Sequence, residues 1–229
     1  MRHALLLRLG RVPYEPALRL QRALHALRRA GRVPDLLLAL EHEPVVTLGR
    51  AGNNADLLLS PAELRKQGVE VYAVERGGAA TYHGPGQLVL YPIVHLRELE
   101  LSLREYVGRL EEVLIRTGKE FGVELFRRPG HPGAWHARGK VGFIGIHVHR
   151  WVTLHGLAMN VDLKPNGFAW IVPCGLKDVP VASLSELSAA PCPLVEVERV
   201  AIEAFSEVFG METVEISGEE VRPWLSRNG

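Results

Sequence analysis

The sequence predicts an α+β fold, and three features of the chain lead to this prediction. Apolar residues recur at helical spacing at 16–30 and again at 196–209. Between Lys140 and Val161, apolar and polar residues alternate as they do along β-strands. The strand-like segments also follow one another in runs, without the strict alternation of strand and helix that typifies a parallel α/β fold.

The first third of the chain contains two predicted helices and three predicted strands. The helix at 16–30 carries its leucines on one stripe and its arginines toward solvent. Short apolar runs at 36–40 and 45–48 predict two strands. A short helix is expected at 61–67, and the alternating residues of 69–73 predict a strand that leads into a glycine-rich loop.

The rest of the chain adds further strands and two long helices. A strand is predicted at 88–94, and a helix should begin after Ser102, where Ser102 and Glu105 have capping-box spacing. This helix is expected to end near 121, before a glycine. The alternating segment from Lys140 onward predicts two long strands that form a hairpin near Arg150. No repeat, low-complexity tract or long linker interrupts this pattern.

Length, composition and charge narrow the class of protein. A chain of 229 residues with 47% hydrophobic residues can bury a full core, so we expect one domain over 1–229. Lysine plus arginine (27) nearly balance aspartate plus glutamate (26), so we expect neither nucleic acid nor a membrane as partner. Arg8 interrupts the leucine run at 5–7, so we expect no secretory leader. We therefore expect a cytoplasmic protein, and we expect it to be a monomer.

The glycine-rich loop is the segment most suggestive of a ligand site. It runs from Arg76 to Gln87 with the sequence Arg-Gly-Gly-Ala-Ala-Thr-Tyr-His-Gly-Pro-Gly-Gln and includes His83. Glycine lets the backbone approach a ligand closely or adopt positive φ, and a simple turn needs fewer glycines than this loop has. We therefore expect the substrate to lie here.

Two residues beyond the loop have the potential for chemistry, and each also has an ordinary structural interpretation. Cys174 follows a strand-like segment and precedes a predicted short helix, whose N–H groups would stabilise a thiolate. The alternative is a small buried hydrophobic side chain. Lys140 opens an apolar, glycine-broken strand. It is either a surface lysine at a strand end or a buried base whose pKa burial lowers toward neutrality.

The second cysteine and several histidines receive structural interpretations. Cys192 lies between two prolines and is interpreted as buried, with both cysteines as free thiols. His155 and Asn160 are interpreted as hydrogen-bonded structural residues. His147 and His149 share one face of a predicted strand. The sequence has neither Cys-x-x-Cys nor His-Glu-x-x-His spacing, so we expect no metal site.

Four motifs occur in order along the chain, and together they resemble one family. They are Arg-Gly-Gly-x-x-Thr-Tyr-His-Gly-Pro-Gly-Gln from 76, Lys-Val-Gly-Phe-Ile-Gly-Ile from 140, His-Gly-Leu-Ala-Met-Asn from 155 and Cys-Gly from 174. In this order and spacing they resemble the octanoyltransferases of lipoate synthesis, the lipoyl(octanoyl) transferases, over about 36–187. One departure is Ala182 before Ser183, where the family more often has threonine.

The resemblance implies a fold and a reaction. The fold is that of the biotin and lipoate protein ligases, a mixed sheet flanked by helices. In the implied reaction, the octanoyl group arrives as a thioester on the phosphopantetheine arm of acyl carrier protein and moves to Cys174, with Lys140 as base. The ε-amine of a specific lysine then takes it, on a lipoyl domain of a 2-oxoacid dehydrogenase or on glycine cleavage H protein. No ATP and no resident cofactor are implied.

The resemblance also implies which residues contact the acyl group. These are Arg76, Gly77, Gly78, Ala79, Ala80, Thr81, Tyr82, His83, Phe143, Ile144, Gly145, Gly156, Leu157 and Ala158. The apolar residues among them would let the enzyme distinguish acyl chains by length, because each buried CH₂ contributes about 0.8 kcal/mol. Glycines 77, 78, 145 and 156 are expected to give the hydrocarbon room, and Arg76 and His83 to shape the thioester end.

Three alternatives stay open from the sequence alone. An ATP-dependent lipoate or biotin protein ligase makes the same amide through an acyl-adenylate, although the loop matches neither the Walker pattern nor the Gly-Arg-Gly-Arg type of biotin ligases. A non-catalytic acyl-binding module would have little use for Lys140. A cysteine hydrolase would use His83 or His155 as base. Arg127, Arg128 and the arginines of the first helix are interpreted as a solvated face, with contact to an acidic carrier as the alternative.

Overall fold

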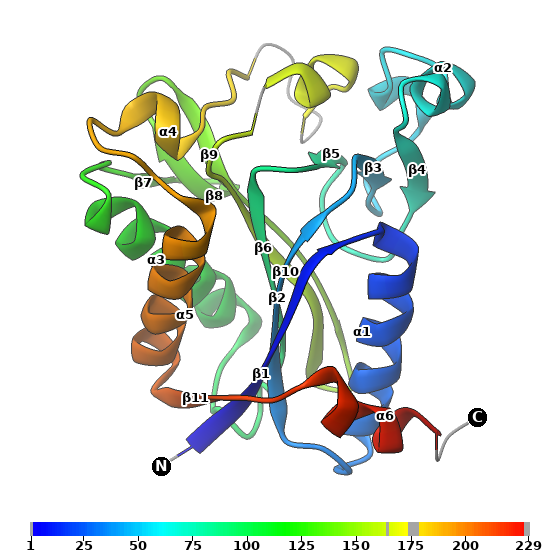
Figure 1. The fold of residues 1–229 in the computed structure, drawn as a ribbon, viewed down its shortest axis with the longest axis vertical. Helices are drawn as coiled ribbons and strands as arrows, with labels where there is room; N and C mark the ends of the chain where they lie inside the picture. The colour runs from blue at the N-terminus through cyan, green and yellow to red at the C-terminus, as the bar shows by residue number, and fades with distance from the viewer. Residues whose placement is uncertain (1, 164, 174–178, 227–229) are drawn as a thin grey trace.

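Two β-sheets and six α-helices make up the part of the chain that the computed structural model describes, residues 2–163, 165–173 and 179–226 (Figure 1). The large sheet has eight strands, in the order β11 (Met211–Glu215), β1 (Arg2–Val12), β2 (Asp35–His42), β6 (Gln87–Ile93), β10 (Val152–Asn160), β9 (Gly139–His149), β8 (His131–His136) and β7 (Phe126–Arg128). The small sheet has the order β4 (Glu70–Ala73), β3 (Val45–Leu48) and β5 (Ala80–His83). Both sheets mix parallel and antiparallel pairs.

Helices cover both faces of the large sheet (Figure 1). On one face lie α3 (Leu103–Glu120) and α5 (Leu194–Phe209), and on the other lie α1 (Tyr14–Arg29) and the small sheet. The remaining helices are short: α2 (Pro61–Lys66), α4 (Leu184–Leu187), α6 (Gly218–Ser226) and the 3₁₀ turns η1 (Asn54–Asp56) and η2 (Pro165–Trp170). The α+β prediction and the predicted mixed sheet between helices are confirmed.

The long predicted elements are confirmed, and their local chemistry explains where they begin and turn. Ser102 Oγ accepts the N–H of Glu105, while Ser102 N–H donates to the Glu105 carboxylate at 2.8 Å, so the expected capping box starts α3. The hairpin of β9 and β10 turns at Arg150 and Trp151, with φ of 49° and 68°. Two successive left-handed residues form the turn that matches strand twist, although neither is glycine.

Several elements were not predicted, namely β1, β5, β7, β8, β11 and α6. In β1, Arg8 ended the apolar run in the sequence, yet it is accommodated on the strand by ion pairs with Glu198 and Glu215. Arg11 further along β1 lies 3.7 Å from a carboxylate oxygen of Glu41. Because β1 pairs in parallel with β2 and β11, its position in the sheet is determined by strands that are distant from it in the sequence.

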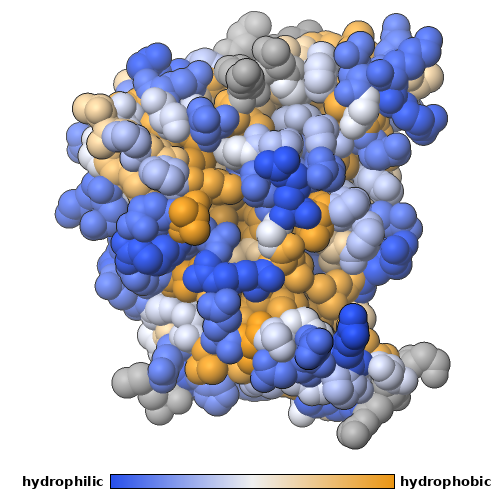
Figure 2. Space-filling view, in the orientation of Figure 1, coloured by the Kyte–Doolittle hydropathy of each residue, from blue (hydrophilic) through white to orange (hydrophobic). Residues whose placement is uncertain are grey.

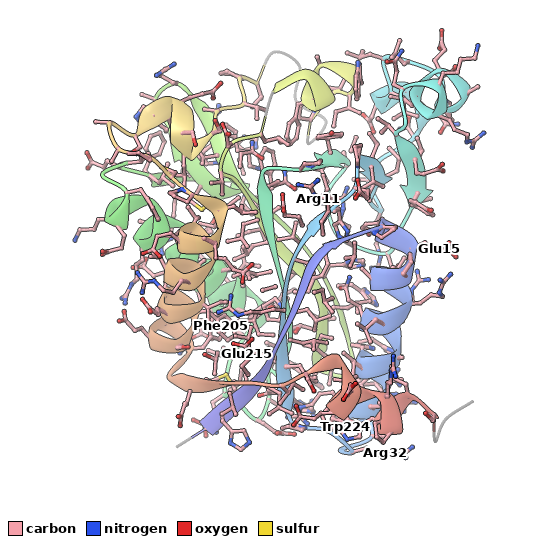
Figure 3. All side chains as sticks on the ribbon, viewed as in Figure 1. Arg11, Glu15, Arg32, Phe205, Glu215 and Trp224 are labelled. Carbon is pink, nitrogen blue, oxygen red and sulfur yellow. The ribbon has the colours of Figure 1, made fainter. Side chains whose placement is uncertain are left out.

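Hydrophobic side chains fill the space on both sides of the large sheet. Phe205 of α5 lies against the sheet on the α3 side, and Trp224 of α6 packs among residues of the α1 side (Figure 3). In Figure 2, hydrophilic residues cover the helical flanks, and hydrophobic residues show in the centre of this face between them. Among the described helices, none is long and apolar enough to cross a membrane.

Candidate active site

A pocket lies where β9 and β10 of the large sheet face the glycine loop and the start of α1. Its atom-free volume, counted out to its mouth, is about 510 Å³. Its walls come from Tyr14, Arg76, Gly78, Ala79, Ala80, Thr81, His83, Tyr91, Lys140, Phe143, Ile144, Gly145, His155, Gly156, Leu157 and Ala158. The three sequence motifs that the structure describes, those from 76, 140 and 155, thus all contribute to this one cavity.

The glycine loop is tied to both sheets at its first residues. Gly77 N–H donates to Ile146 O of β9 at 2.8 Å, beyond the point where β8 stops pairing with β9. The buried Arg76 guanidinium donates through Nη2 to Thr47 O at 2.6 Å and to Thr47 Oγ1 at 2.8 Å. Arg76 therefore fastens the loop to β3, and the loop closes one side of the pocket.

Two glycines serve this packing and do not give a ligand room. A Cβ on Gly145 would lie 2.9 Å from Cδ of Arg76, and a Cβ on Gly156 would lie 2.2 Å from Leu90 O. At such distances the loop or the neighbouring strand would have to shift. The expectation that these two glycines make space for hydrocarbon is therefore wrong, because protein atoms occupy that space.

Lys140 places a buried amine in the wall of the pocket. Only 3% of the residue is exposed, so the interpretation as a surface lysine is wrong. Its contacts include Pro132 O, which accepts from Nζ at 2.9 Å, and the rings of Trp135 and Phe143, whose centroids both lie 5.0 Å from Nζ. An ammonium over aromatic faces is stabilised electrostatically. The side chain is thus held at the pocket wall from several sides.

Cys174 lies outside the described residues, so the structure does not test its predicted role. Two described residues, one on each side of its segment, pair with residues of the pocket wall. Pro173 forms a β-bridge with Ala80, and Val181 forms one with Lys140. The two flanks of the segment that contains Cys174 therefore meet two residues of the pocket wall. Cys192 is a free, buried thiol, as its sequence context predicts.

A cluster of aromatic and imidazole rings forms the polar end of the pocket. It consists of Tyr14, His42, His83, Tyr91 and His155, with successive ring centroids 5.0 to 6.4 Å apart. His42 Nδ1 lies 3.2 Å from Val12 O, which can only accept, so Nδ1 carries the proton. Tyr91 Oη then donates to His42 Nε2 at 2.8 Å. Burial lowers the pKa of His42 to about 4, so this ring is neutral at pH 7.

His83 is oriented by a relay of side-chain amides. Asn160 Nδ2 donates to Ala182 O, and Asn160 Oδ1 accepts from Gln87 Nε2 at 2.8 Å. Gln87 Oε1 is then the acceptor for His83 Nδ1 at 2.6 Å. Burial, followed by repulsion from His42, lowers the pKa of His83 to about 3. The predicted structural role of Asn160 is confirmed by these bonds.

His155 has a strained backbone and an unsatisfied ring nitrogen. Its φ is 60°, which is rare for a residue with a Cβ, and only 2% of the residue is exposed. Nε2 has no hydrogen-bond partner among the described residues and lies 3.9 Å from a carboxylate oxygen of Glu75. Thr81 Oγ1, also on the pocket wall, is likewise buried and unpaired within the described part of the chain. Unpaired buried groups facing a pocket are typical of a site that holds a ligand or water.

The structure brings most of the predicted contact residues together, while their roles stay predictions. Gly77 lines a neighbouring cavity, and Tyr82 turns away to pack edge-on against Phe168 and Trp170. Sequence reasoning did not find Tyr14 and Tyr91. Tyr91 lies in a strand that is buried throughout, where an aromatic residue is by default part of the core. The sequence therefore gives no sign that the Tyr91 ring lies beside the rings of His42 and His155.

Comparison with known proteins places the chain in a family. The profile of the lipoyl protein ligase A/B catalytic domain matches residues 13–206. This chain belongs to that family. An octanoyltransferase of Gloeobacter violaceus is 46% identical over 216 residues, which cover 93% of each protein. An octanoyltransferase of Caldicellulosiruptor saccharolyticus is 43% identical over 212 residues, which cover 92% of this chain and 90% of that relative.

Solved structures of the family confirm the predicted fold. A lipoate-protein ligase A bound with ATP superposes with a TM-score of 0.80 at 17% identity, covering 98% of this chain and 93% of the ligase. The ligase of a bipartite lipoylation system from Thermoplasma acidophilum gives a TM-score of 0.77 at 17% identity, covering 99% and 91%. At such low identity these likenesses concern the fold alone.

Proposed function

We propose that this protein transfers an octanoyl group from octanoyl-acyl carrier protein to the ε-amine of a specific lysine on lipoyl domains. Cys174 carries the acyl group as a thioester between the two half-reactions, and Lys140 acts as base. The acceptors are lipoyl domains of 2-oxoacid dehydrogenases and glycine cleavage H protein. The observation that carries the proposal is a buried lysine in the wall of a largely apolar pocket, in a chain whose relatives at 43% and 46% identity are octanoyltransferases.

The two half-reactions balance without an outside energy source. In the first, the Cys174 thiol gives its proton to Lys140 and attacks the thioester carbonyl, and the departing pantetheine thiolate takes that proton back from Lys140. One thioester replaces another, so this step is nearly isoenergetic. In the second, the acceptor amine attacks the Cys174 thioester, Lys140 passes a proton from the amine to the departing Cys174 thiolate, and the product amide makes the step favourable. The proposed enzyme therefore uses no ATP, metal or resident cofactor.

The dimensions of the pocket support an eight-carbon chain. Lys140 and Ile146 are six residues apart on β9 (146 − 140), and Ile146 pairs with His155 on β10. At about 3.3 Å per residue, some 20 Å of strand separates the two ends of the pocket. An extended octanoyl chain is about 10 Å long, if each bond adds about 1.2 Å as in an extended backbone. This stretch of strand is therefore longer than an extended octanoyl chain.

The cysteine-hydrolase alternative is disfavoured by the histidines. A general base works best with a pKa near the operating pH. Burial lowers the pKa of His83 to about 3 and also lowers the pKa of His155. His83 is therefore poorly suited to hold a thiol proton at neutral pH, and burial shifts His155 in the same direction. The ligase alternative shares the fold, but the ligases compared above are only 17% identical.

Intact mass spectrometry tests the proposal directly. The full-length protein is mixed with octanoyl-acyl carrier protein without ATP, and we expect one octanoyl adduct that Cys174→Ser abolishes. Addition of an unmodified lipoyl domain should then discharge the adduct and acylate one lysine. An adduct that requires ATP, or that Cys174→Ser leaves unchanged, would contradict the proposal. Release of free octanoate in place of acylated lipoyl domain would favour the hydrolase.

A further inference from the structure

A second cavity adjoins the pocket at Lys140. Its atom-free volume is about 750 Å³, again counted out to its mouth. It lies between α3 and the turn from β7 to β8, with Val107, His131, Pro132 and Ile146 among its walls. Gly78, Lys140, Ile144 and Gly145 line both cavities. The two spaces therefore meet at the residue proposed as base.

We propose that this second cavity binds the phosphopantetheine arm of the acyl donor. The inference rests on the proposed function, because the cavity receives such an arm only if the acyl donor is a thioester of phosphopantetheine. A linear thioester whose reacting carbonyl lies beside Lys140 must extend in two directions. The first cavity receives the hydrocarbon, so the arm needs a separate space, and the second cavity, which shares Lys140 with the first, provides one.

The size and lining of the cavity favour the arm over the acceptor's lysine side chain. A lysine side chain beyond Cβ is a short methylene stem with one amine, and a pantetheine arm has several times as many heavy atoms. Val107, Ile144 and Ile146 give apolar walls for the methylenes and the gem-dimethyl group of the arm. The second cavity is larger than the acyl pocket itself, which favours the longer of the two occupants.

Two arginines lie next to residues that line this cavity, one on each side of it. Arg104 is exposed one turn before Val107 on α3, so the two share a helix face. On the other side, His131 lines the cavity, and Arg128 of β7 pairs with it across the turn between β7 and β8. The Arg128 guanidinium stacks over the ring of Trp135 at 4.9 Å. Positive charge therefore borders the cavity from both elements that enclose it.

The acidic residue on the same face of α3 does not cancel this charge. Glu111 is one turn after Val107. Its carboxylate lies 3.3 Å from Nε of Arg127 and also accepts the N–H of Gly133 at 3.2 Å. The rim of the cavity is therefore basic, which is complementary to the phosphodiester at the far end of the arm.

Shortened donors test the inference on the wild-type protein. Acylation of the enzyme is followed by intact mass with octanoyl-pantetheine and with octanoyl-N-acetylcysteamine, which keeps the thioester and lacks most of the arm. If the cavity binds the arm, kcat/KM for the shortened donor falls by about tenfold or more, because remote binding energy is lost. Equal values for the two donors would overturn the inference. No acylation by either donor, or by octanoyl-acyl carrier protein, would instead overturn the proposed function.

A variant that fills the cavity gives the second arm of the test. Val107→Trp should slow acylation by octanoyl-pantetheine about tenfold more than it slows acylation by the shortened donor. The matched control is Lys119→Trp, an exposed position on the same helix about 18 Å away at 1.5 Å per residue, which should change neither rate. Equal slowing of both donors by Val107→Trp, or no slowing, contradicts the inference.

Two further readouts separate the arm from the acceptor lysine as occupant of the cavity, and the first of them, on Arg104→Glu, keeps the test valid if Val107→Trp does not fold. Arg104→Glu should raise KM for octanoyl-acyl carrier protein several-fold and leave kcat close to that of the wild type, an effect that added salt reduces. Discharge of the preformed acyl-enzyme by a lipoyl domain should be unaffected by Val107→Trp. If discharge slows and acylation does not, the cavity receives the acceptor lysine, and the inference is wrong.

Discussion

The face of the large sheet beneath α3 and α5 and the face beneath α1 and the small sheet bury different kinds of side chain (Figure 1). The first is filled by hydrocarbon, with Phe205, Leu110 and Val113 fully buried. The second buries the titratable groups of the ring cluster, together with Arg76. Burying polar groups costs free energy unless each is paired, so their concentration on one face identifies where function has been placed.

The largest expected effect comes from removing the buried amine of the pocket. Lys140→Met keeps the buried hydrocarbon and removes the amine. We expect kcat/KM for octanoyl transfer to fall by about 10²–10⁴-fold, the usual contribution of a general base. The circular dichroism spectrum should be unchanged, because methionine fills most of the same buried space. Transfer at the wild-type rate would remove Lys140 from the mechanism.

On the face of the large sheet beneath α3 and α5, the largest expected effect is a loss of stability without a loss of activity. Phe205 is fully buried and stacks on Phe209 with ring centroids 4.5 Å apart. Phe205→Ala should lower the free energy of unfolding by about 3–5 kcal/mol through lost burial and a cavity. Urea denaturation measures this loss, and transfer activity per folded molecule should stay unchanged. Val195→Ala, at a position 74% exposed on the same helix, is the control and should cost less than about 0.5 kcal/mol. A stable Phe205→Ala protein with reduced activity would contradict this division between the faces.

The same contrast explains what the sequence could and could not predict. The helices on both faces were predictable, because each carries its own apolar stripe and, in α3, its own capping box. Strands β1 and β11 were not, because each is defined by a partner far away in the sequence. The glycine loop and Lys140 were found through motifs. Tyr91 and His42 were missed, because only the register of β2 and β6 brings their polar atoms together.

Buried histidines on the pocket face should make stability depend on pH. Burial lowers the pKa values of His42 and His83 to about 4 and about 3, from 6.5. Both rings are neutral in folded and unfolded chains above pH 6.5, so stability is highest there. As pH falls below 6.5, the unfolded chain binds protons first, and stability decreases until the folded pKa is reached. From pH 7 to pH 5, each ring should cost about 2 kcal/mol.

Urea denaturation at pH 7, 6 and 5 measures this dependence. His42→Gln should remove its share, so the decrease between pH 7 and pH 5 becomes smaller by about 2 kcal/mol. The exposed His3, changed to Gln, is the control and should leave the pH dependence as it is in the wild type. A decrease of the same size in His42→Gln would show that other groups cause it.

The smallest expected effects come from one buried tyrosine on each face. Tyr91 Oη donates to His42 Nε2 at 2.8 Å, so Tyr91→Phe leaves a buried nitrogen unpaired. We expect a loss of about 1–3 kcal/mol in the free energy of unfolding. Tyr106 is fully buried on the α3 face, and its hydroxyl lies near Thr153 but outside hydrogen-bonding geometry. Tyr106→Phe removes a polar group without leaving a partner unpaired, so stability should stay within about 0.5 kcal/mol or rise. Urea denaturation at pH 7 measures both losses of free energy. Equal losses in the two variants would contradict the difference between the faces, because they would show that a buried hydroxyl contributes as much beneath α3 and α5 as it does on the pocket face.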